Sequence, residues 1–515
     1  MTLAKNESST SSQKSEIVLE KEQEITTSTT TTTTTKTTTT TTNASAPIPS
    51  GNHEKKRKRD ETNDTALNHR DTKREKTEPR SEMHHQQREN RDILSAAHQD
   101  TANGNAEISS ASSQPHPSFF DSKFKGALLH THFSGTVKST TLFNFLASDP
   151  RCMDKVALFK ERRNWNLAWV SENCPYDAMT QQKLNDEHVH TLQKAVHSAW
   201  DSNFHENFKV LGDLFFYLVK NVDFYPLYLE LIRQEMKEQH IAHIELRLKL
   251  GSLFQYDQNK KIQFCSIQYE MDRLLEAQEI FKQEGLSMVI IAQSSKHAPQ
   301  RKVFEHFMTI LKLLRDNPKY RSLVKGFDLV GHEMEGKPLW SFSQKVESLN
   351  NLIRAWKLDI PFLFHAGEDF KDLRKSLGNV ECALKYGDRR IGHGIYAFKR
   401  RDLVDSINKR GFVLEFCPYS MSFFGHLEGD TVEAFRRSNL KYCINSDDSN
   451  KIRDADMNAN IAFLLERGFT QDEIIESFRV SIEASLCSQE VKDQMLSKWR
   501  EEYFSAGGQS ANQKS

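Results

Sequence analysis

The seven residues Gly126–His132, GALLHTH, decide the fold, because they join an apolar strand to two histidines. Side chains two residues apart in a strand point to the same side, so His130 and His132 can face one common point. A pair of this kind also closes many ordinary strands. Its meaning depends on whether other strands of the chain end in similar residues.

Seven further β-rich runs follow, most of them separated by stretches whose apolar residues recur at i, i+3 and i+4. The eight predicted strands cover 126–132, 242–248, 286–293, 325–333, 360–368, 389–395, 411–418 and 440–448. Strands that alternate with helices form parallel βαβ units, and eight such units close a (β/α)8 TIM barrel. An open doubly wound sheet is the alternative, but no G-x-G-x-x-G follows the first strand. We therefore predict an α/β barrel.

The predicted barrel domain covers 118–508 and is flanked by two tails. Residues 1–117 include a threonine tract at 26–42 and hold too few large apolar residues to fold, so we predict a disordered tail there. Residues 509–515 are predicted to form a short frayed tail. The segment 148–238 is too long for a single crossover, so it is predicted to be a helical insertion that serves as a dimer interface or a lid.

Composition points to no particular partner, since 70 lysines and arginines balance 70 aspartates and glutamates. The basic run at 55–59, KKRKR, is a candidate nuclear-localisation signal or non-specific nucleic-acid contact, or simply a solvated charge run. We find neither a signal peptide nor an apolar run of membrane-spanning length. The seven scattered cysteines favour a reducing compartment. These features predict a cytoplasmic protein, with the nucleus as the alternative.

Polar residues gather where the predicted strands end. His365 and Glu368 end the fifth strand, His393 lies in the sixth, and Asp447 and Asp448 end the eighth. Active sites of (β/α)8 barrels form at the carboxyl ends of the strands. Together with the first strand, these ends offer imidazoles and a carboxylate, an ordinary ligand set for zinc. We predict one zinc ion per chain.

Five short motifs also occur in a characteristic order: HTH at 130–132, HAGE at 365–368, RIGHG at 390–394, EFCPYS at 415–420 and SDD at 446–448. As an ordered set they resemble the adenosine/AMP deaminase family. The segments KGALLHTH and GFDLVGHE are most similar to its growth-factor-like branch. The resemblance implies hydrolysis of adenosine, and of 2′-deoxyadenosine, to the 6-oxo nucleoside and ammonia. It implies zinc ligands at His130, His132, His365 and Asp447.

The resemblance also implies roles around the purine ring. Glu368 matches the acid that protonates purine N1, which needs a tuned pKa in a dry pocket. His393 matches the residue that orients the water and takes its proton. Asp448 matches the acceptor for N7, and the backbone N–H of Gly331 would reach N3, where a glycine permits close approach.

Other positions leave alternatives open. Asp328 and Glu415 either fix the orientation of the metal ligands or are buried groups satisfied by the backbone. Phe133 and Ser134 stand where intracellular family members place an acid that contacts the sugar. The exact substrate is therefore open.

Three other functions compete with adenosine deamination. The first is deamination of another 6-amino purine, AMP or an N6-substituted nucleoside, with Arg389 and Arg390 as candidate phosphate contacts. The second is a barrel without turnover that binds or signals, against which the full ligand set argues. The third is a nucleic-acid deaminase, which we exclude because the chain holds no P-C-x-x-C motif.

Overall fold

The structure is a computed structural model that describes residues 119–152, 155–161, 164–170, 181–183, 193–194, 196, 204–427 and 429–505. The predicted tails at 1–117 and 509–515, with the basic run at 55–59, lie outside these residues. Their predictions therefore stay untested, as do the expected location and the homodimer. No helix in the described part of the chain is long and apolar enough to cross a membrane.

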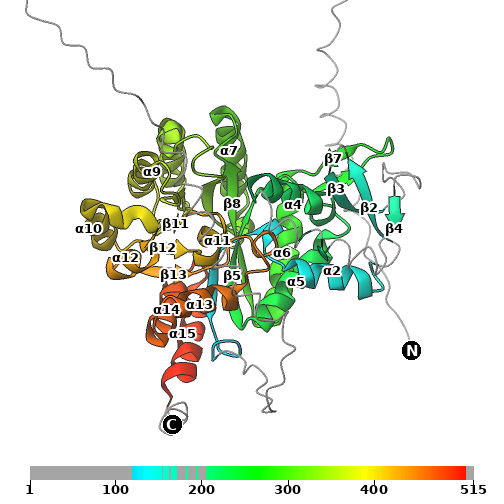
Figure 1. The fold of residues 1–515 in the computed structure, drawn as a ribbon. Coiled ribbons are helices and arrows are strands. Elements are labelled where there is room, and N and C mark those ends of the chain that lie inside the picture. Colours follow the sequence, from blue (N-terminus) through cyan, green and yellow to red (C-terminus); the bar gives the residue numbers. More distant parts are fainter. Residues whose placement is uncertain are drawn as a thin grey trace, which may run out of the picture. The chain divides into compact units, whose positions relative to one another are not determined.

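Eight parallel strands form a closed barrel, which confirms the predicted fold (Figure 1). The strands are β1 (Gly126–His132), β5 (Ile241–Leu248), β8 (Ser287–Ser295), β9 (Val324–Val330), β10 (His365–Ala366), β11 (Arg390–His393), β12 (Val413–Phe416) and β13 (Tyr442–Ile444). They pair as two four-stranded halves, β1-β5-β8-β9 and β10-β11-β12-β13. Single bridges join the halves, Phe327 to Phe362 on one side and Thr131 to Asp447 on the other.

Helices follow the strands and cover the outside of the barrel. They are α2 (Ser139–Ser148), α6 (Ile267–Gln283), α7 (Gln300–Asp316), α8 (Ser343–Ala355), α9 (Leu373–Tyr386), α10 (Arg401–Arg410), α11 (Pro418–Phe423), α12 (Thr431–Arg437), α13 (Met457–Glu466), α14 (Gln471–Ala484) and α15 (Gln489–Phe504). Helix α7 buries Val303, Phe307, Ile310, Leu311 and Leu314. This spacing places one apolar stripe against the barrel wall, as the periodicity predicted.

The strands of the second half are shorter than predicted, and left-handed backbone occurs at or after the carboxyl ends of three of them. β11 stops at His393, whose φ is +61°, and Asp447 turns the chain after β13 with φ +64°. Gly367 adopts φ +72° directly after β10. Non-glycine residues seldom adopt positive φ, and such positions concentrate at functional sites.

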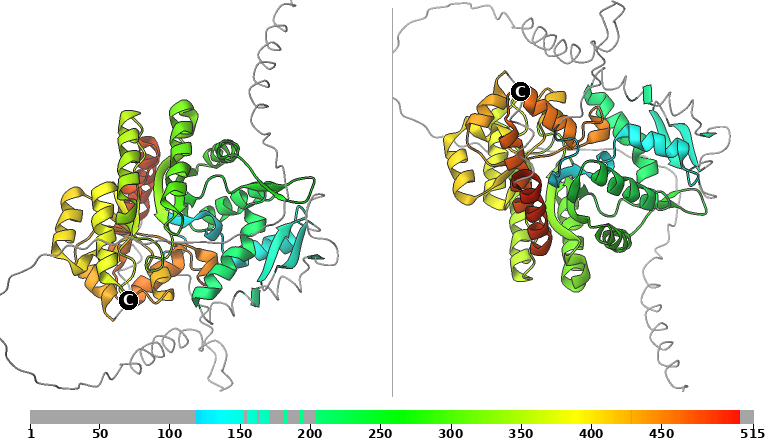
Figure 2. Two further views of the ribbon diagram at one scale, coloured as in Figure 1. Left: turned by 90° about the horizontal axis from the view of Figure 1, so that it is seen from above. Right: turned by 90° about the horizontal axis from the view of Figure 1, so that it is seen from below.

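The segment between β1 and β5 contains more than the expected helices. Its described part includes helices α4 (Phe204–Val219) and α5 (Tyr225–Glu238), together with strands β2 (Val156–Glu161), β3 (Asn164–Trp169) and β4 (Gln181–Lys183). The three strands form an antiparallel sheet. Figure 2 shows this sheet on the side of the barrel away from α10. The runs VALFKE and NWNLAW carry the strand signal, which the length of the segment alone concealed.

A second short addition follows β5. Strands β6 (Phe254–Tyr256) and β7 (Ile262–Phe264) form a hairpin before α6 begins. Phe254 is buried while Phe264 is 57% exposed, so the hairpin is anchored along one strand only.

Candidate active site

The strand ends bring the predicted metal ligands into one cluster. The imidazole centroids of His130 and His365 lie 4.5 Å apart, and those of His132 and His365 lie 5.3 Å apart. His393 joins them with its centroid 4.8 Å from that of His130. Asp447 Oδ1 lies 3.4 Å from His132 Nε2 and 3.7 Å from His130 Nε2. Four strands far apart in the sequence thus supply one site.

Closure of the barrel places Asp447 beside this cluster. Its backbone N–H donates to the His130 carbonyl at 3.1 Å, and the His132 N–H donates to the Asp447 carbonyl at 3.2 Å. The hydroxyl of Ser420 donates to Oδ2 of Asp447 at 2.7 Å. The other carboxylate oxygen, Oδ1, therefore faces the histidines.

Each of the three candidate histidine ligands has its Nδ1 against a side-chain oxygen. The pairs are His130 with Glu415 at 2.9 Å, His365 with Asp328 at 2.8 Å, and His132 with Gln293 at 2.9 Å. These oxygens accept, so the hydrogen sits on Nδ1 and the lone pair is left on Nε2. Nε2 of His130 is buried and has no hydrogen-bond partner among the described residues. This arrangement fits a metal ion, because ligating imidazoles use the second nitrogen in this way.

Burial favours the neutral imidazole, the form that binds metals, at His130 and His365. Burial and the nearby Arg247 hold the pKa of His130 well below its usual value. Burial lowers the pKa of His365 to about 4, although the carboxylate of Asp328 works in the opposite direction. Burial also lowers the pKa of His393 strongly, which keeps its imidazole neutral.

A buried ion network, which the sequence analysis did not identify, holds the orienting carboxylates. Arg247 Nε donates to Asp328 at 2.8 Å, and a second nitrogen of the same guanidinium contacts Glu415. Arg390 donates to Glu415 at 2.7 Å and pairs with Glu245. All five side chains are fully buried. The alternating charges of β5 within an apolar strand were the sequence signal for this network.

A second buried carboxylate anchors the loop that carries Glu368. Glu333 accepts the backbone N–H groups of Gly367, Glu368 and Asp369 at 2.8–3.0 Å. The side chain of Glu368 is 12% exposed. Burial raises its pKa well above the ordinary value; Lys296 opposes this shift and Glu333 adds to it. The structure therefore favours a protonated Glu368.

The two predicted substrate contacts lie at the carboxyl ends of β13 and β9, two strands that are four positions apart in the barrel. Asp448 follows Asp447 and pairs with Lys451, whose Nζ is 2.8 Å from Oδ1. Burial alone would raise the pKa of Asp448, but Lys451 outweighs that effect and the net shift is downward. Gly331 follows β9 with φ +114°, and a Cβ there would lie 2.9 Å from the ring of His297. Only glycine suits this position.

A second group of metal-capable side chains borders the first, and it was not predicted. The ligand atoms of His332, Asp369 and His426 lie within 4.8 Å of one another. His426 Nδ1 is 3.6 Å from Oε1 of Glu368. His332 lies within the segment GFDLVGHE and Asp369 directly follows HAGE. His426 lies in the loop after α11, and the residues around it in the sequence match none of the motifs.

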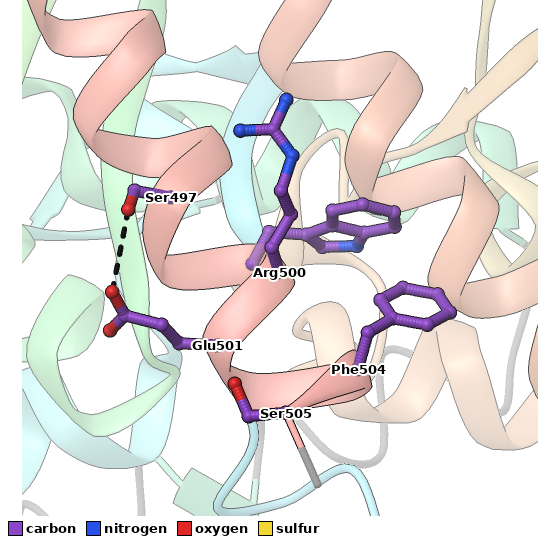
Figure 3. A pocket seen from close by; sticks show the side chains of 6 residues that line it. Ser497, Arg500, Glu501, Phe504 and Ser505 are labelled. Atoms are coloured by element: carbon purple, nitrogen blue, oxygen red, sulfur yellow. Dashed lines mark hydrogen bonds between the residues drawn. The ribbon is translucent and has the colours of Figure 1, made fainter.

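A hollow elsewhere on the surface lacks such chemistry. It measures about 550 Å³ and lies along the C-terminal helix (Figure 3). Its lining residues are Ser497, Trp499, Arg500, Glu501, Phe504 and Ser505. They come from α15 and the residue after it and include neither histidine nor cysteine, so this hollow offers no metal site comparable with the strand ends.

Comparison with known proteins places the chain in a family. The family model described as adenosine deaminase matches residues 176–502, more than half of the chain. An adenosine deaminase 2 from Dictyostelium discoideum is 30% identical over 195 residues, which are 38% of this chain and 34% of that protein. An adenosine deaminase from Phlebotomus duboscqi is 26% identical over 325 residues, 58% of each chain. The chain thus spans about a third to three fifths of these relatives.

Solved structures share the barrel. An adenine deaminase from Arthrobacter aurescens aligns with TM-score 0.53 and 17% identity, over 73% of this chain and 98% of that one. An amidohydrolase from Burkholderia ambifaria, with bound Zn, aligns with TM-score 0.52 and 18% identity, over 77% and 94%. At this identity the likeness concerns the fold alone. The match to the family model carries the assignment: this chain belongs to the adenosine deaminase family.

Proposed function

We propose that this protein hydrolyses adenosine, and 2′-deoxyadenosine, to the corresponding 6-oxo nucleoside and ammonia, using one zinc ion. The observation that carries the proposal is the orientation of His130, His132 and His365. All three hold Nδ1 against an oxygen acceptor, and Nε2 of His130 and His132 faces Asp447. Three imidazoles and a carboxylate are a ligand set suited to zinc, and they lie at the end of the barrel where active sites of this fold form.

The residues around the candidate metal site would carry out separate steps of the hydrolysis. A zinc ion held by His130, His132, His365 and Asp447 would supply a water of lowered pKa as the nucleophile. His393, kept neutral by burial, would take a proton from that water. Glu368 would deliver its proton to N1 of the purine, which makes C6 electrophilic.

Recognition of the ring would fall to Asp448 and Gly331. N7 of an N9-substituted purine is itself an acceptor, so Asp448, which is ionised beside Lys451, would have to take up a proton in order to donate a hydrogen bond to N7. The sugar contact of the intracellular enzymes has no counterpart at Phe133, because its ring is buried and stacks on Tyr225 with centroids 5.1 Å apart. Recognition of the sugar must therefore come from other residues.

The arginines considered as phosphate contacts are engaged elsewhere. Arg390 is fully buried and paired with Glu245 and Glu415. Arg389 precedes β11, at the end opposite the candidate site, and pairs with Asp359. Neither residue supports binding of AMP, so a nucleoside is the favoured substrate.

The test incubates purified, zinc-loaded protein with adenosine, deoxyadenosine or AMP. Turnover is measured as the loss of absorbance from the 6-amino purine. We expect turnover of the two nucleosides, abolished by a zinc chelator and restored by added zinc. If AMP is turned over faster than either nucleoside, AMP is the substrate and the assignment to a nucleoside is wrong. Failure with all three compounds in a protein shown to hold zinc would overturn the proposed function.

A further inference from the structure

The imidazole of His426 lies between two carboxylates at the edge of the candidate active site. Its Nδ1 is 3.6 Å from Oε1 of Glu368, and its Nε2 is 3.4 Å from Oδ2 of Asp369. His426 is 1% exposed and Asp369 is fully buried. The sequence thus brings a histidine from the loop after α11 against the candidate acid, which lies 58 residues earlier in the chain.

The backbone around His426 fixes the imidazole in this place. Its N–H donates to the Met421 carbonyl at 2.8 Å, and its own carbonyl accepts the hydroxyl of Tyr396 at 2.6 Å. The ring of Phe424 stacks on the imidazole with centroids 5.4 Å apart. These contacts hold the ring between the carboxylates.

Asp369 is held equally firmly. Its backbone N–H donates to Glu333 at 3.0 Å, and its Oδ1 accepts the N–H of Lys371 at 2.9 Å. Oδ2 is the oxygen that faces His426. A carboxylate beside one imidazole nitrogen places the hydrogen on that nitrogen, as in hydrolytic triads. The lone pair of Nδ1 is then directed at Glu368.

We propose that His426, oriented by Asp369, is a positioning residue that holds the proton on Glu368 and so keeps this carboxyl in its acid form. The inference rests on the proposed function for its catalytic consequence. In the deamination, the proton of Glu368 ends on N1 of the product. One proton of the added water leaves in ammonia, and the other is released to solvent. Glu368 must then recover a proton, and the lone pair of Nδ1 of His426 favours the protonated carboxyl once it has done so.

Several titratable and charged groups surround Glu368 and His426 and influence their pKa values. Lys296, Glu333, Asp447 and Asp369 act on Glu368. On the other side, the His332 ring lies 5.6 Å from that of His426, and His426 acts electrostatically on His393. None of these groups substitutes for an acceptor at Nδ1, so loss of His426 should destabilise the protonated form of Glu368.

The experiment replaces the imidazole in the zinc-loaded enzyme by His426→Ala. We expect unchanged zinc content, a kcat lowered about 10-fold or more at near-constant KM, and a basic limb of the pH profile shifted to lower pH. Added imidazole should restore kcat, while pyrrole, which has the ring without the basic nitrogen, should not. A variant with unchanged kcat and pH profile, or one rescued equally by pyrrole, would overturn the proposal.

The matched control is His306→Ala, which removes another largely buried histidine, one bonded through Nε2 to the Leu250 carbonyl. It should leave kcat near the wild-type value. A second readout does not need turnover: ring-nitrogen NMR titration of His426, assigned with the His426→Ala variant. Its midpoint should move by about half a unit or more in Glu368→Gln. If the midpoint does not move, the proposal for His426 is wrong, whether or not any purine is turned over. If the midpoint moves but no purine is turned over, only the proposed function is wrong.

Discussion

Two histidine clusters border Glu368, and they differ in where the ring hydrogens lie. At the strand ends, the three candidate ligands each place Nδ1 against an oxygen acceptor. In the neighbouring cluster, Nδ1 of His332 receives the backbone N–H of Glu335 at 3.3 Å, which puts its hydrogen on Nε2. His426 faces a carboxylate with each nitrogen. Similar residue types are thus arranged for a metal in one cluster and for protons in the other.

The largest effect expected is loss of the metal from the first cluster. His365→Ala removes one imidazole from the four-ligand set, so zinc content should fall from one ion per chain to near zero. Deaminase activity should fall by more than about 10³-fold, since the nucleophile depends on the cation. Metal analysis and turnover on the same preparation measure both quantities.

His332→Ala is the matched change in the second cluster. It should leave zinc at one ion per chain, because the tautomer of His332 does not present a lone pair at Nε2. A second bound ion in the wild-type protein that disappears in this variant would break the comparison.

The next largest effect concerns the acid between the clusters. Glu368→Gln keeps the size of the side chain but has no proton of suitable acidity, so kcat should fall about 10²–10⁴-fold while zinc stays bound. Glu501→Gln on the exposed surface of α15 is the control and should turn over normally. Retained activity in Glu368→Gln would refute the role of this residue as the acid.

The sequence allowed the first cluster to be predicted but not the second. His130, His132, His365 and Asp447 end strands of strong β pattern, and the geometry of a barrel brings strand ends together. His426 lies in a loop, whose path depends on packing around Tyr396 and Phe424 rather than on local pattern. No regularity of the sequence relates such a loop to Glu368.

The buried charges were difficult to predict for a related reason. Arg247 reaches Glu415 across 168 positions of the chain and crosses the barrel interior to do so. Charge within β5 could be read from the sequence, but the identity of each partner follows only from the closed ring of strands. The left-handed backbone at His393 and Asp447 could not be predicted either, because neither residue type requires it.

The third effect concerns the buried ion network that holds the carboxylates Asp328 and Glu415 behind the first cluster. Arg247→Met leaves Asp328 and Glu415 without their shared cation, so the free energy of unfolding should drop by about 3–5 kcal/mol. Urea unfolding monitored by circular dichroism measures the loss. Arg400→Met, which breaks an exposed pair with Asp402, should cost less than about 1 kcal/mol. Equal losses in the two variants would show that the buried network does not stabilise the barrel.

The smallest effect is a pH dependence of stability at the junction of the clusters. The pKa of Glu368 is raised in the folded protein, chiefly by burial, above its unfolded value of about 4.3. The folded state therefore binds the extra proton between these two values. The stabilisation is complete below the unfolded pKa and is lost as pH rises through the folded one, by up to about 1.4 kcal/mol per pH unit.

Glu368→Gln removes this titration, so the difference between the unfolding free energies of the wild type and the variant should decline with pH across that window. Metal-free protein is the correct sample, because a bound cation would act on the same carboxyl. Parallel stability curves would mean that Glu368 is ionised in the fold. A carboxylate at that place would make the imidazole of His426 a donor rather than an acceptor and would merge the two clusters into one charged site.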